Sequence, residues 1–598
     1  MTCLVSILKR HRTMSITPRG MSIQEAYRNY AEGKFLVNRK YQRKLVWTVD
    51  EKEFLIDSIL KDLPIPLILL AQTKDGKLEL IDGLQRMNAI ISFIENRFAI
   101  NGLFFDVSQS SRAKQSADEE LFQMITDKKS LLDAKSCANF LDYQLAITVY
   151  PTADEKEVTD IFGRINSGGK QLSPQEKRQA GMLDKFSEVI RKISSEIRGD
   201  SSEDILNLSG MPEISIDSNR EKIGYGLIAE NIFWCKHGII WKKQLRDSED
   251  EEIILDIVSS ILKDEPIAKS RELFNDIYDA QTSEHKELNT ELIKYGADRL
   301  MHEIKVTFSI IENVFDTHDA KIIDIVNPKS RNPVKESFFA IFMAFFDLVV
   351  KEEESPAEFD KIVGALSGLQ KKMKSTANYS LTKDRVKNIN TTIGLIQKYF
   401  VKKDPPVLKH GAGLALDFEN SIRRAKIESN RYECKQGFFD LSDNRKLNEN
   451  LFSEIIETIC AIANVGPDAD GFVFIGVADK ETDAQRIKQF DKVDFKTINQ
   501  RYIVGIDREI AISKGTYDDY VNKFLGKISS SDLSEPLKSH VLSQFDIIEY
   551  KGLTVLRIRV PRQTNVSFVG KDSYIRENSK TLKLEGPKLL AASKLFGK

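Results

Sequence analysis

The chain has 598 residues, which is too long for one ordinary hydrophobic core and predicts about three domains. It carries 88 Lys and Arg against 89 Asp and Glu, so no overall positive charge points to a nucleic-acid partner, and any basic surface must be local. Its five cysteines lie far apart without a CxxC pair. That spacing argues against a disulfide framework and a zinc ribbon, and it favours a reducing cytoplasm.

The sequence predicts no membrane span and no membrane partner. The N-terminus, MTCLVSILKRHR, has an apolar run that is too short for a signal peptide. The most apolar stretch, FFAIFMAFFDLVV at 338–350, is shorter than the ~20 residues of a membrane helix and contains Asp347. We therefore expect a buried core helix at this position.

The first part of the chain, 1–200, predicts a mixed α/β domain. An amphipathic run at 49–63 predicts a helix, and alternating residues at 67–82 predict a hairpin that turns at an Asp-Gly pair. The hairpin leads through Asp82-Gly83 into a second helix. LDYQLAITVYP at 141–151 predicts a further strand that is ended by its proline.

The remainder predicts a helical middle and a second α+β unit. Helix-spaced apolar residues recur through the middle, and VKKDPPVLKHGAG at 401–413 is the clearest linker. A helix ending in ICAIAN, the strand GFVFIGVAD and a hairpin that turns at Lys551-Gly552 follow the linker. The predicted fold is multidomain α+β: an α/β domain at 1–200, an all-helical domain at 201–405 and an α+β domain at 415–598.

Three short segments of the first domain concentrate polar residues beyond what packing needs. They are YQRKLVW at 41–47, IDGLQR at 81–86 and IFGRINSGGKQLSPQE at 161–176. In IDGLQR the glycine permits a sharp turn, so that the free amides at the helix start can face an anion. Arg86 adds a forked charge for a phosphate, and Asp82 can hold a metal or orient a water. The pattern favours a nucleotide site; the simpler alternative is a helix cap with an Asp82–Arg86 surface pair.

The end of the third segment has a structural interpretation. Ser173-Pro174-Gln175-Glu176 is a capping box with proline at the first helical position. We assign these four residues to folding. Ser167-Gly168-Gly169 before them is a loop that either closes over a ligand or only connects.

In this order and spacing, the three segments resemble the N-terminal domain of the GmrSD-type modification-dependent restriction enzymes, over roughly residues 14–200. That family has a ParB/sulfiredoxin-like core and a DGQQR signature, and the resemblance implies binding and hydrolysis of ATP or GTP coupled to nuclease control. Leu84 replaces the first glutamine and cannot donate a hydrogen bond, so hydrolysis stays open. By position, the resemblance assigns the nucleotide to Asp82, Gly83, Gln85, Arg86, Gln42, Arg43, Arg164 and Asn166.

A second polar cluster begins at IESNRYECKQG, residues 427–437. If YECK is a strand, Glu433 and Lys435 project from one face, because side chains alternate along a strand. Glu428 stands five residues before Glu433, and Asp479 ends the strand GFVFIGVAD. Carboxylates with a lysine can hold Mg²⁺ or Mn²⁺ and steady a phosphate under hydrolysis. The alternative is a solvated charged strand.

The ExxxxExK spacing, the helix ending A-x-A-N, GFVFIGVAD and DSYIRENSKTLKL resemble the Schlafen AlbA-like domain over about residues 415–595. In nuclease members of that family, three acids form the active centre. NVGPDADGF departs from the asparagine and closely following glycine pair of many members, and many AlbA-like domains are described only as nucleic-acid binders, so catalysis stays open. The matching positions assign the metal and catalysis to Glu428, Glu433 and Asp479, with Lys435 and Arg576 gripping the backbone phosphate.

Basic residues of the last hairpin predict a nucleic-acid-binding face. Arg557 and Arg559 share one side of their strand, and Arg562 flanks it, so that with Arg576 they can contact phosphates. The alternative is the solvent face of an amphipathic hairpin. The seven histidines show no HxH or HxxxH pair, so we expect the Schlafen-like unit in place of the HNH-like nuclease common in GmrSD-type enzymes.

Taken together, the motifs predict a cytoplasmic, prokaryotic antiphage defence protein. A nucleotide-binding N-terminal domain would control a C-terminal metal-dependent nuclease acting on DNA or tRNA, through a helical middle whose surface favours homo-oligomers. The main alternative is a non-catalytic nucleic-acid-binding regulator whose only enzyme is an N-terminal NTPase. A third interpretation is a scaffold in which both sites have decayed.

Overall fold

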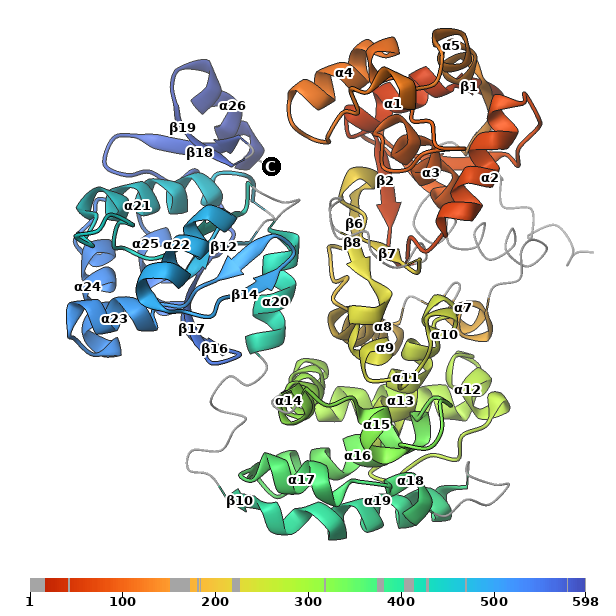
Figure 1. Ribbon diagram of the computed structural model, residues 1–598, viewed down its shortest axis with the longest axis vertical. Coiled ribbons are helices and arrows are strands. Elements are labelled where there is room, and N and C mark those ends of the chain that lie inside the picture. Colours follow the sequence, from red (N-terminus) through yellow and green to blue (C-terminus); the bar gives the residue numbers. More distant parts are fainter. Residues whose placement is uncertain are drawn as a thin grey trace, which may run out of the picture. The chain divides into compact units, whose positions relative to one another are not determined.

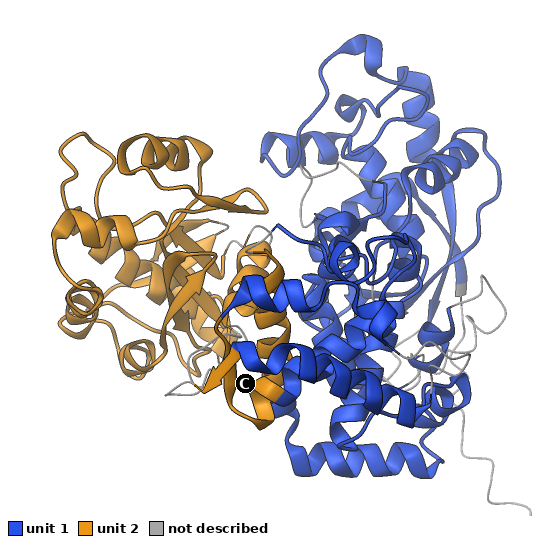
Figure 2. Cartoon of the chain, turned by 60° about the horizontal axis from the view of Figure 1, so that its bottom comes forward, with its two compact units in different colours: residues 1–301, 318–347, 358–399 blue, residues 302–317, 348–357, 400–598 orange. Residues whose placement is uncertain are grey.

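The fold is taken from a computed structural model (Figure 1). It comprises two compact units: residues 1–301, 318–347 and 358–399 form unit 1, and residues 302–317, 348–357 and 400–598 form unit 2 (Figure 2). The multidomain α+β fold predicted from the sequence is confirmed, and its three-part division stays a prediction. The structure describes residues 17–40, 44–150, 173–179, 182, 184–217, 226–316, 319–373, 381–402, 414–425, 430–467, 470–577 and 579–596.

Unit 1 contains a six-stranded mixed sheet with the order β1-β5-β3-β4-β2-β6. The β3–β4 hairpin is antiparallel, whereas β5 runs parallel to β3 and β2 runs parallel to β4. The Asp-Gly turn predicted for the hairpin is confirmed, with Gly76 at φ +83°. The strands are β1 (Thr17–Ser22), β2 (Phe35–Asn38), β3 (Ile68–Gln72), β4 (Leu78–Asp82), β5 (Gln144–Tyr150) and β6 (Ile205–Asn207).

The strand predicted at 141–151 is confirmed as β5, which begins at Gln144. The residues just before it belong to a helix, α5 (Ala134–Asp142), because the side chain of Asp133 caps that helix through the amide of Ser136. The proline that was expected to end the strand lies outside the described residues.

Helices α1 (Ile23–Ala31), α2 (Val49–Leu60) and α3 (Leu84–Ile94) pack on this sheet and share its hydrophobic core. The helix predicted at 49–63 is confirmed as α2, and a capping box between Thr48 and Glu51 starts it. Nearly every residue of α3 is buried, so the helix that follows the IDGLQR turn is a core element.

The middle of the chain, for which an all-helical domain was predicted, is largely helical but also holds five short strands among its described residues: three at its start, and β9 (Glu354–Pro356) paired with β10 (Phe400–Lys402). The first of them, β6, extends the N-terminal sheet by pairing with β2, and β7 (Glu213–Ser215) pairs with β8 (Gly226–Ile228). The main helices are α8 (Lys185–Arg198), α11 (Glu249–Leu262), α13 (Ser283–Tyr295), α14 (Ala297–Asp316), α16 (Lys335–Phe346) and α19 (Thr382–Ile396).

The apolar stretch at 338–350 is a buried core helix, as predicted. It forms most of α16 and the π-helical turn Asp347–Lys351, and residues Ser337 to Phe346 are all buried. Among the residues that the structure describes, no helix is long and apolar enough to cross a membrane.

Helix α7 (Pro174–Gln179) confirms the predicted capping box at the end of the third motif segment. The Glu176 amide donates to Ser173 Oγ at 3.2 Å, and the Ser173 amide donates to a Glu176 carboxylate oxygen at 2.8 Å. Beyond this cap, the Arg178 guanidinium pairs with Glu252 of α11 at 2.9 Å. The helix is thereby tied to the helical middle by its own side chains.

Unit 2 contains a four-stranded sheet with the order β11-β12-β17-β16, in which β11 and β12 are parallel. The predicted strand GFVFIGVAD is broken at Gly476, whose φ of +102° and close approach to the backbone of Gly505 turn the chain. The strands of this sheet are β11 (Tyr432–Lys435), β12 (Gly471–Ile475), β16 (Phe545–Tyr550) and β17 (Leu553–Val560). The predicted β16–β17 hairpin is confirmed, with positive φ at Lys551 and Gly552.

Three smaller sheets accompany the four-stranded sheet among the described residues of unit 2, and one of them pairs β9 with β10. The order β13-β15-β14 joins β13 (Val477–Ala478), β14 (Lys496–Ile498) and β15 (Arg501–Ile503), and β18 (Ser573–Glu577) pairs with β19 (Lys580–Leu584). These strands lie outside the four-stranded sheet, but they supply arginines to the candidate site described below.

Two hydrophobic cores cover the two faces of the four-stranded sheet. Helix α20 (Leu414–Arg424) packs on one face through Phe418, whose ring lies 5.4 Å from that of Phe474. Helices α21 (Glu449–Ala463) and α24 (Tyr517–Ser529) contribute to the core of the other face. The predicted helix ending in ICAIAN is confirmed as α21. Most of the predicted linker at 401–413 lies outside the described residues.

Candidate functional site

The IDGLQR turn joins β4 to α3 through a corner that only glycine fits. Gly83 has φ +101°, and a Cβ added there would lie 2.9 Å from Ile68 Cγ1. The Gly83 amide donates to Asp82 Oδ1 at 2.7 Å. Asp82 is therefore held at the corner by the turn itself.

The same turn makes the ion pair that the simpler interpretation expected. Arg86 Nη2 lies 2.8 Å from Asp82 Oδ2 and donates to the Leu67 carbonyl at 3.2 Å. The Asp82 side chain is 38 % exposed and that of Arg86 15 % exposed. Within the described part of the chain, no side chain caps α3. The first amides of the helix are therefore not used by a described side chain, and that they bind a nucleotide phosphate stays a prediction.

Gln85 connects the second motif segment to the first. Its Nε2 donates to the Lys44 carbonyl at 2.7 Å, and its Oε1 accepts from the amides of Val46 and Trp47 at 3.2 and 3.3 Å. The neighbouring Leu84 is 3 % exposed and belongs to the core. Leu84, which departs from the family signature, thus fills a position in the hydrophobic core. The nucleotide role of Gln85 stays a prediction.

Four residues of the predicted nucleotide site, Gln42, Arg43, Arg164 and Asn166, lie outside the described residues. The lysine next to two of them was not predicted from the sequence. Lys44 Nζ donates to the Leu245 carbonyl at 2.8 Å and to Ser248 Oγ at 2.7 Å, and its side chain is 3 % exposed. Lys44 therefore ties the first motif segment to the start of α11, and its place within a motif was the signal available in the sequence.

In unit 2, Glu433 and Lys435 lie on one face of β11, as predicted. Lys435 Nζ meets Glu433 Oε1 at 2.7 Å, and Arg576 Nη2 from β18 meets Glu433 Oε2 at 2.8 Å. Arg576 also donates to the Tyr432 carbonyl and to Thr581. The Arg576 side chain is 2 % exposed and that of Glu433 13 % exposed, so this pair is a buried part of the fold.

Asn464, at the end of α21, helps to place that arginine. Its Nδ2 donates to the Tyr574 carbonyl at 2.8 Å and to Ser573 Oγ at 3.0 Å, and its Oδ1 accepts from the amide of Ser567 at 2.8 Å. These bonds fix the start of β18 against α21. The asparagine of the family pattern therefore acts here as a structural anchor.

Asp479 follows β13 and forms an ion pair with Arg501 of β15. The pKa of Asp479 is raised, chiefly because protein atoms around the carboxylate exclude water; Arg501 opposes the shift and Glu433 adds to it. The side chain is nevertheless 45 % exposed, unlike that of Glu433. The influence of Glu433 on Asp479 places the two acids in one charge cluster, whereas Glu428 lies outside the described residues.

Arg501 is a member of the cluster that was not predicted from the sequence. It directly follows a two-residue hairpin turn in which Asn499 and Gln500 have φ of +46° and +64°. In the β13–β15 register Ala478 faces Tyr502, and one further step sets Asp479 opposite Arg501. The two-residue turn at Asn499 was the signal in the sequence.

The chemistry of the donor set fits a hard cation. Glu433 and Asp479 supply carboxylate oxygens, and Mg²⁺ is commonly bound through one or two carboxylates together with substrate phosphates. The described residues contain no group of three His, Cys, Asp or Glu side chains that could hold a metal ion. That Glu433 and Asp479 hold Mg²⁺ or Mn²⁺ stays a prediction.

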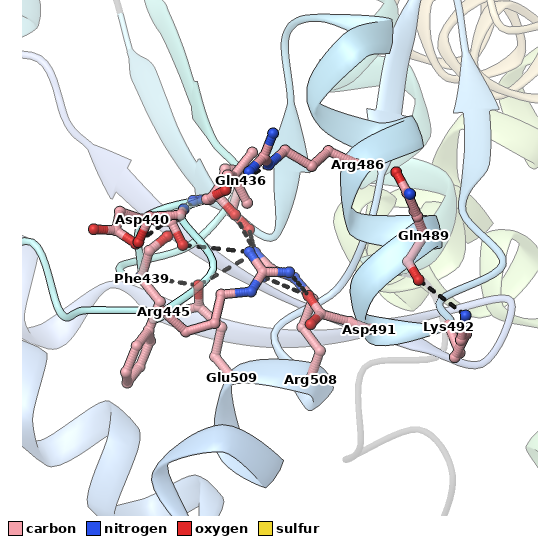
Figure 3. Close-up of polar contacts among 12 residues, drawn as sticks. Gln436, Phe439, Asp440, Arg445, Arg486, Gln489, Asp491, Lys492, Arg508 and Glu509 are labelled. Carbon is pink, nitrogen blue, oxygen red and sulfur yellow. Dashed lines mark hydrogen bonds and ion pairs between the residues drawn. The ribbon is translucent and has the colours of Figure 1, made fainter.

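The loop after β11 is clamped by a buried carboxylate (Figure 3). Glu509, which is fully buried, accepts from the amides of Phe438 and Phe439 at 2.7 and 3.0 Å. Its neighbour Arg508 donates to the Gln436 carbonyl at 2.8 Å and pairs with Asp491 at 3.2 Å (Figure 3). Burial raises the pKa of Glu509, and Arg508 opposes the shift. The network fixes the chain directly after Lys435.

The predicted basic face of the hairpin is present on β17. In the β12–β17 register Arg557 faces Phe474 and Arg559 faces Phe472, so the two arginines share one side. The Arg557 side chain is 10 % exposed and pairs with Asp546 at 2.7 Å. That of Arg559 is 48 % exposed and pairs with Asp470. Of the two, Arg559 is the one open to a phosphate, and nucleic-acid contact by these residues stays a prediction.

Comparisons with known families agree with the motifs. Residues 23–183 match the family described as the N-terminal domain of the GmrSD restriction endonuclease, and residues 428–585 match the family described as Schlafen, AlbA_2. The predicted fusion of these two domain types is confirmed. Together the two matches indicate a nucleic-acid enzyme of the restriction or defence type. No curated protein and no solved structure matches the chain.

Proposed function

We propose that the C-terminal unit hydrolyses phosphodiester bonds of DNA or RNA with a divalent cation, and that the N-terminal domain binds a nucleotide and controls this activity. The observation that carries the proposal is the joint charge cluster of Glu433, Asp479 and Lys435 in the segment that matches Schlafen AlbA_2. Such clusters hold cations and phosphates next to one another.

In this proposal Glu433 and Asp479 hold Mg²⁺ or Mn²⁺, with Glu428 as the third acid of the family pattern. When bound, the cation supplies Lewis-acid polarisation of the phosphate and lowers the pKa of a water. Lys435, whose ammonium contacts Glu433 and is 28 % exposed, faces the negative charge that develops on the phosphate oxygens. Arg576 keeps Glu433 oriented, because its guanidinium is buried against that carboxylate.

The nucleotide proposal rests on the geometry of the IDGLQR turn. The start of α3 has no described side-chain cap, and Arg86 lies beside it, so amides and a guanidinium together can meet the phosphates of ATP or GTP. Asp82 is 38 % exposed and can bind a phosphate-bound cation only by releasing Arg86. Nucleotide binding would then shift Gln85 and, with it, the segment from Lys44 to Trp47 whose backbone it holds.

The four described cysteines, Cys137, Cys235, Cys434 and Cys460, are free thiols. Free thiols persist in a reducing compartment, so we place this activity in the cytoplasm. Its substrates there would be invading DNA or cellular RNA.

The test is cleavage by the purified full chain. Plasmid, single-stranded DNA and tRNA are incubated with Mn²⁺ or Mg²⁺, with and without each NTP, for the wild type and for Asp479→Asn and Glu433→Gln. We expect metal-dependent fragments from the wild type and their loss in both variants. Asp479→Asn is the sharper test, because Asp479 is exposed and its loss leaves the buried Glu433–Arg576 pair in place. Undiminished cleavage by folded Asp479→Asn would contradict the proposal.

A second candidate function is a binding regulator without nuclease activity, whose only enzyme is the N-terminal NTPase. One observation favours it: both carboxylate oxygens of Glu433 already meet cations of the protein, Lys435 and Arg576. In the same assay this candidate predicts nucleic acid that is shifted on a gel but intact, together with release of phosphate from an NTP.

A further inference from the structure

The charge cluster of unit 2 contains three described ion pairs, and two of them differ strongly in exposure. The side chains of Glu433 and Arg576 are 13 % and 2 % exposed, so solvent has little access to their ion pair. Asp479 and Arg501 are 45 % and 24 % exposed, so their pair can be reached by an incoming ion. A buried pair is costly to open, whereas an exposed pair exchanges partners with little loss.

Arg501 also has hydrogen-bonding capacity that Asp479 does not use. Its Nη1 meets Asp479 Oδ1, while its Nε is buried and has no acceptor among the residues that the structure describes. A guanidinium carries five N–H donors in a planar fork that matches phosphate oxygens. Arg501 therefore keeps N–H donors beyond the one that meets Asp479, as Arg86 of the N-terminal turn also does at its Nε.

The hairpin holds Arg501 at this place. Its two-residue turn, Asn499 and Gln500, has positive φ at both residues, and the β13–β15 register sets Arg501 opposite Asp479. The Asn499 side chain further donates to the Arg423 carbonyl of α20 at 3.5 Å. Because the backbone is fixed on both sides, the guanidinium can change its partner without moving the strand.

Arg501 lies among the charges that the proposed function uses. Lys435 and Arg576 are the other described cations of the cluster, and Glu433 and Asp479 are its described acids. A polynucleotide phosphate is the anion that the proposed function supplies to this site.

We propose that Arg501 is a phosphate-binding residue that shares Asp479 with the divalent cation. In the absence of that cation Arg501 neutralises Asp479. When a cation occupies Asp479, the guanidinium is released to a phosphate of the bound strand. This inference rests on the proposed function, since it names the residue that grips the substrate at the same site.

The test combines cation binding and strand binding on the full chain. Ca²⁺ binding is measured by calorimetry, and binding of labelled single-stranded DNA and of labelled tRNA is measured over a KCl series, once in EDTA and once in Ca²⁺. The variants are Arg501→Gln and Arg501→Lys. Lys527→Gln serves as the control, because Lys527 forms an exposed pair with Glu449 outside the cluster.

For Arg501→Gln we expect Ca²⁺ to bind several-fold more tightly than in the wild type, because Asp479 loses its competitor. In Ca²⁺, the salt dependence of strand binding should fall by about one unit of slope, which corresponds to one lost phosphate contact. In EDTA the slope should not change. Arg501→Lys keeps the charge without the fork, so it should keep the slope and bind the strand several-fold more weakly. Lys527→Gln should match the wild type.

The inference is overturned if folded Arg501→Gln binds Ca²⁺ more weakly, since Arg501 would then only support Asp479. It is also overturned if the slope in Ca²⁺ stays at the wild-type value. If Arg501→Gln does not fold, weaker strand binding by Arg501→Lys in Ca²⁺ but not in EDTA still supports the inference, and equal binding refutes it. If the wild type binds neither Ca²⁺ nor a strand, the proposed function itself is wrong. This outcome differs from those that refute only the role of Arg501.

Discussion

The N-terminal IDGLQR turn and the C-terminal charge cluster are both polar motifs at the ends of strands, yet they use their polar groups differently. In the turn, the described hydrogen bonds of the Gln85 amide go to the backbone of a neighbouring segment, and Arg86 is divided between Asp82 and a carbonyl. In the cluster, the Asp479 side chain is nearly half exposed and pairs with Arg501, whose side chain is 24 % exposed.

Side chains that bond to the backbone support the shape of a site, whereas exposed side chains can contact a ligand in it. A motif glutamine whose described hydrogen bonds all go to the backbone supports the fold. An acid that is nearly half exposed is accessible to a ligand. We therefore predict that Asp479 and Arg501 take part in the chemistry, and that Gln85 and Arg576 support the fold.

The largest expected effect separates the buried pair from an exposed one. Arg576→Met should lower the free energy of unfolding by about 3–5 kcal/mol, because it leaves Glu433 buried without its guanidinium. Arg559→Met removes a half-exposed pair with Asp470 and should cost no more than about 1 kcal/mol. Urea unfolding of both variants measures the difference. Equal losses would show that Arg576 is not a supporting residue.

The next effect compares one glycine from each region. Gly437→Ala would drive a Cβ into the buried Glu509 carboxylate, which holds the amides of Phe438 and Phe439, so we expect a loss of about 2–4 kcal/mol. Gly83→Ala meets a positive φ and a contact of 2.9 Å with Ile68 Cγ1, for which about 1–3 kcal/mol is expected. Thermal unfolding ranks the two. A larger loss of stability for Gly83→Ala would mean that the Glu509 carboxylate moves away from the added methyl group more easily than Ile68 does.

A smaller effect tests the structural role of the motif glutamine. Gln85→Ala leaves the Lys44 carbonyl and the amides of Val46 and Trp47 without their partner, and should cost about 1–3 kcal/mol. Gln109→Ala, an exposed glutamine of the same unit, should stay within about 0.5 kcal/mol of the wild type. Chemical unfolding and a nucleotide-induced thermal shift are measured together. If the variant keeps the wild-type stability but no longer binds nucleotide, Gln85 contacts the ligand and is not a supporting residue.

The smallest effect is a pair of opposite pH dependences. Asp479 has a raised pKa, so its contribution to stability is present below the ordinary Asp pKa of about 3.9 and is lost as pH rises through the raised value. Asp479→Asn should therefore gain stability relative to the wild type between pH 3 and 7. Asp75 has a lowered pKa, chiefly because the Thr73 hydroxyl donates to it, so Asp75→Asn should lose stability over the same range. Melting temperatures across pH check both signs, and a shared sign would contradict the assigned environments.

Much of the local structure was predictable. The Asp-Gly hairpin turn, the capping box at Ser173, the α21 helix and the shared face of Glu433 and Lys435 all follow from short-range backbone preferences or side-chain alternation. GFVFIGVAD was predicted as one strand but is broken at Gly476, because the approach of Gly505 brings in a segment that the local pattern does not contain.

The sequence by itself determined which residues turn, cap and alternate, because those properties depend on neighbours within a few positions. Only the tertiary structure decided which charges meet: Arg501 with Asp479, Arg576 with Glu433, and Glu509 with the loop after β11. Each of these partners is separated along the chain by other elements. Their contacts depend on strand register and on packing, which no local pattern specifies.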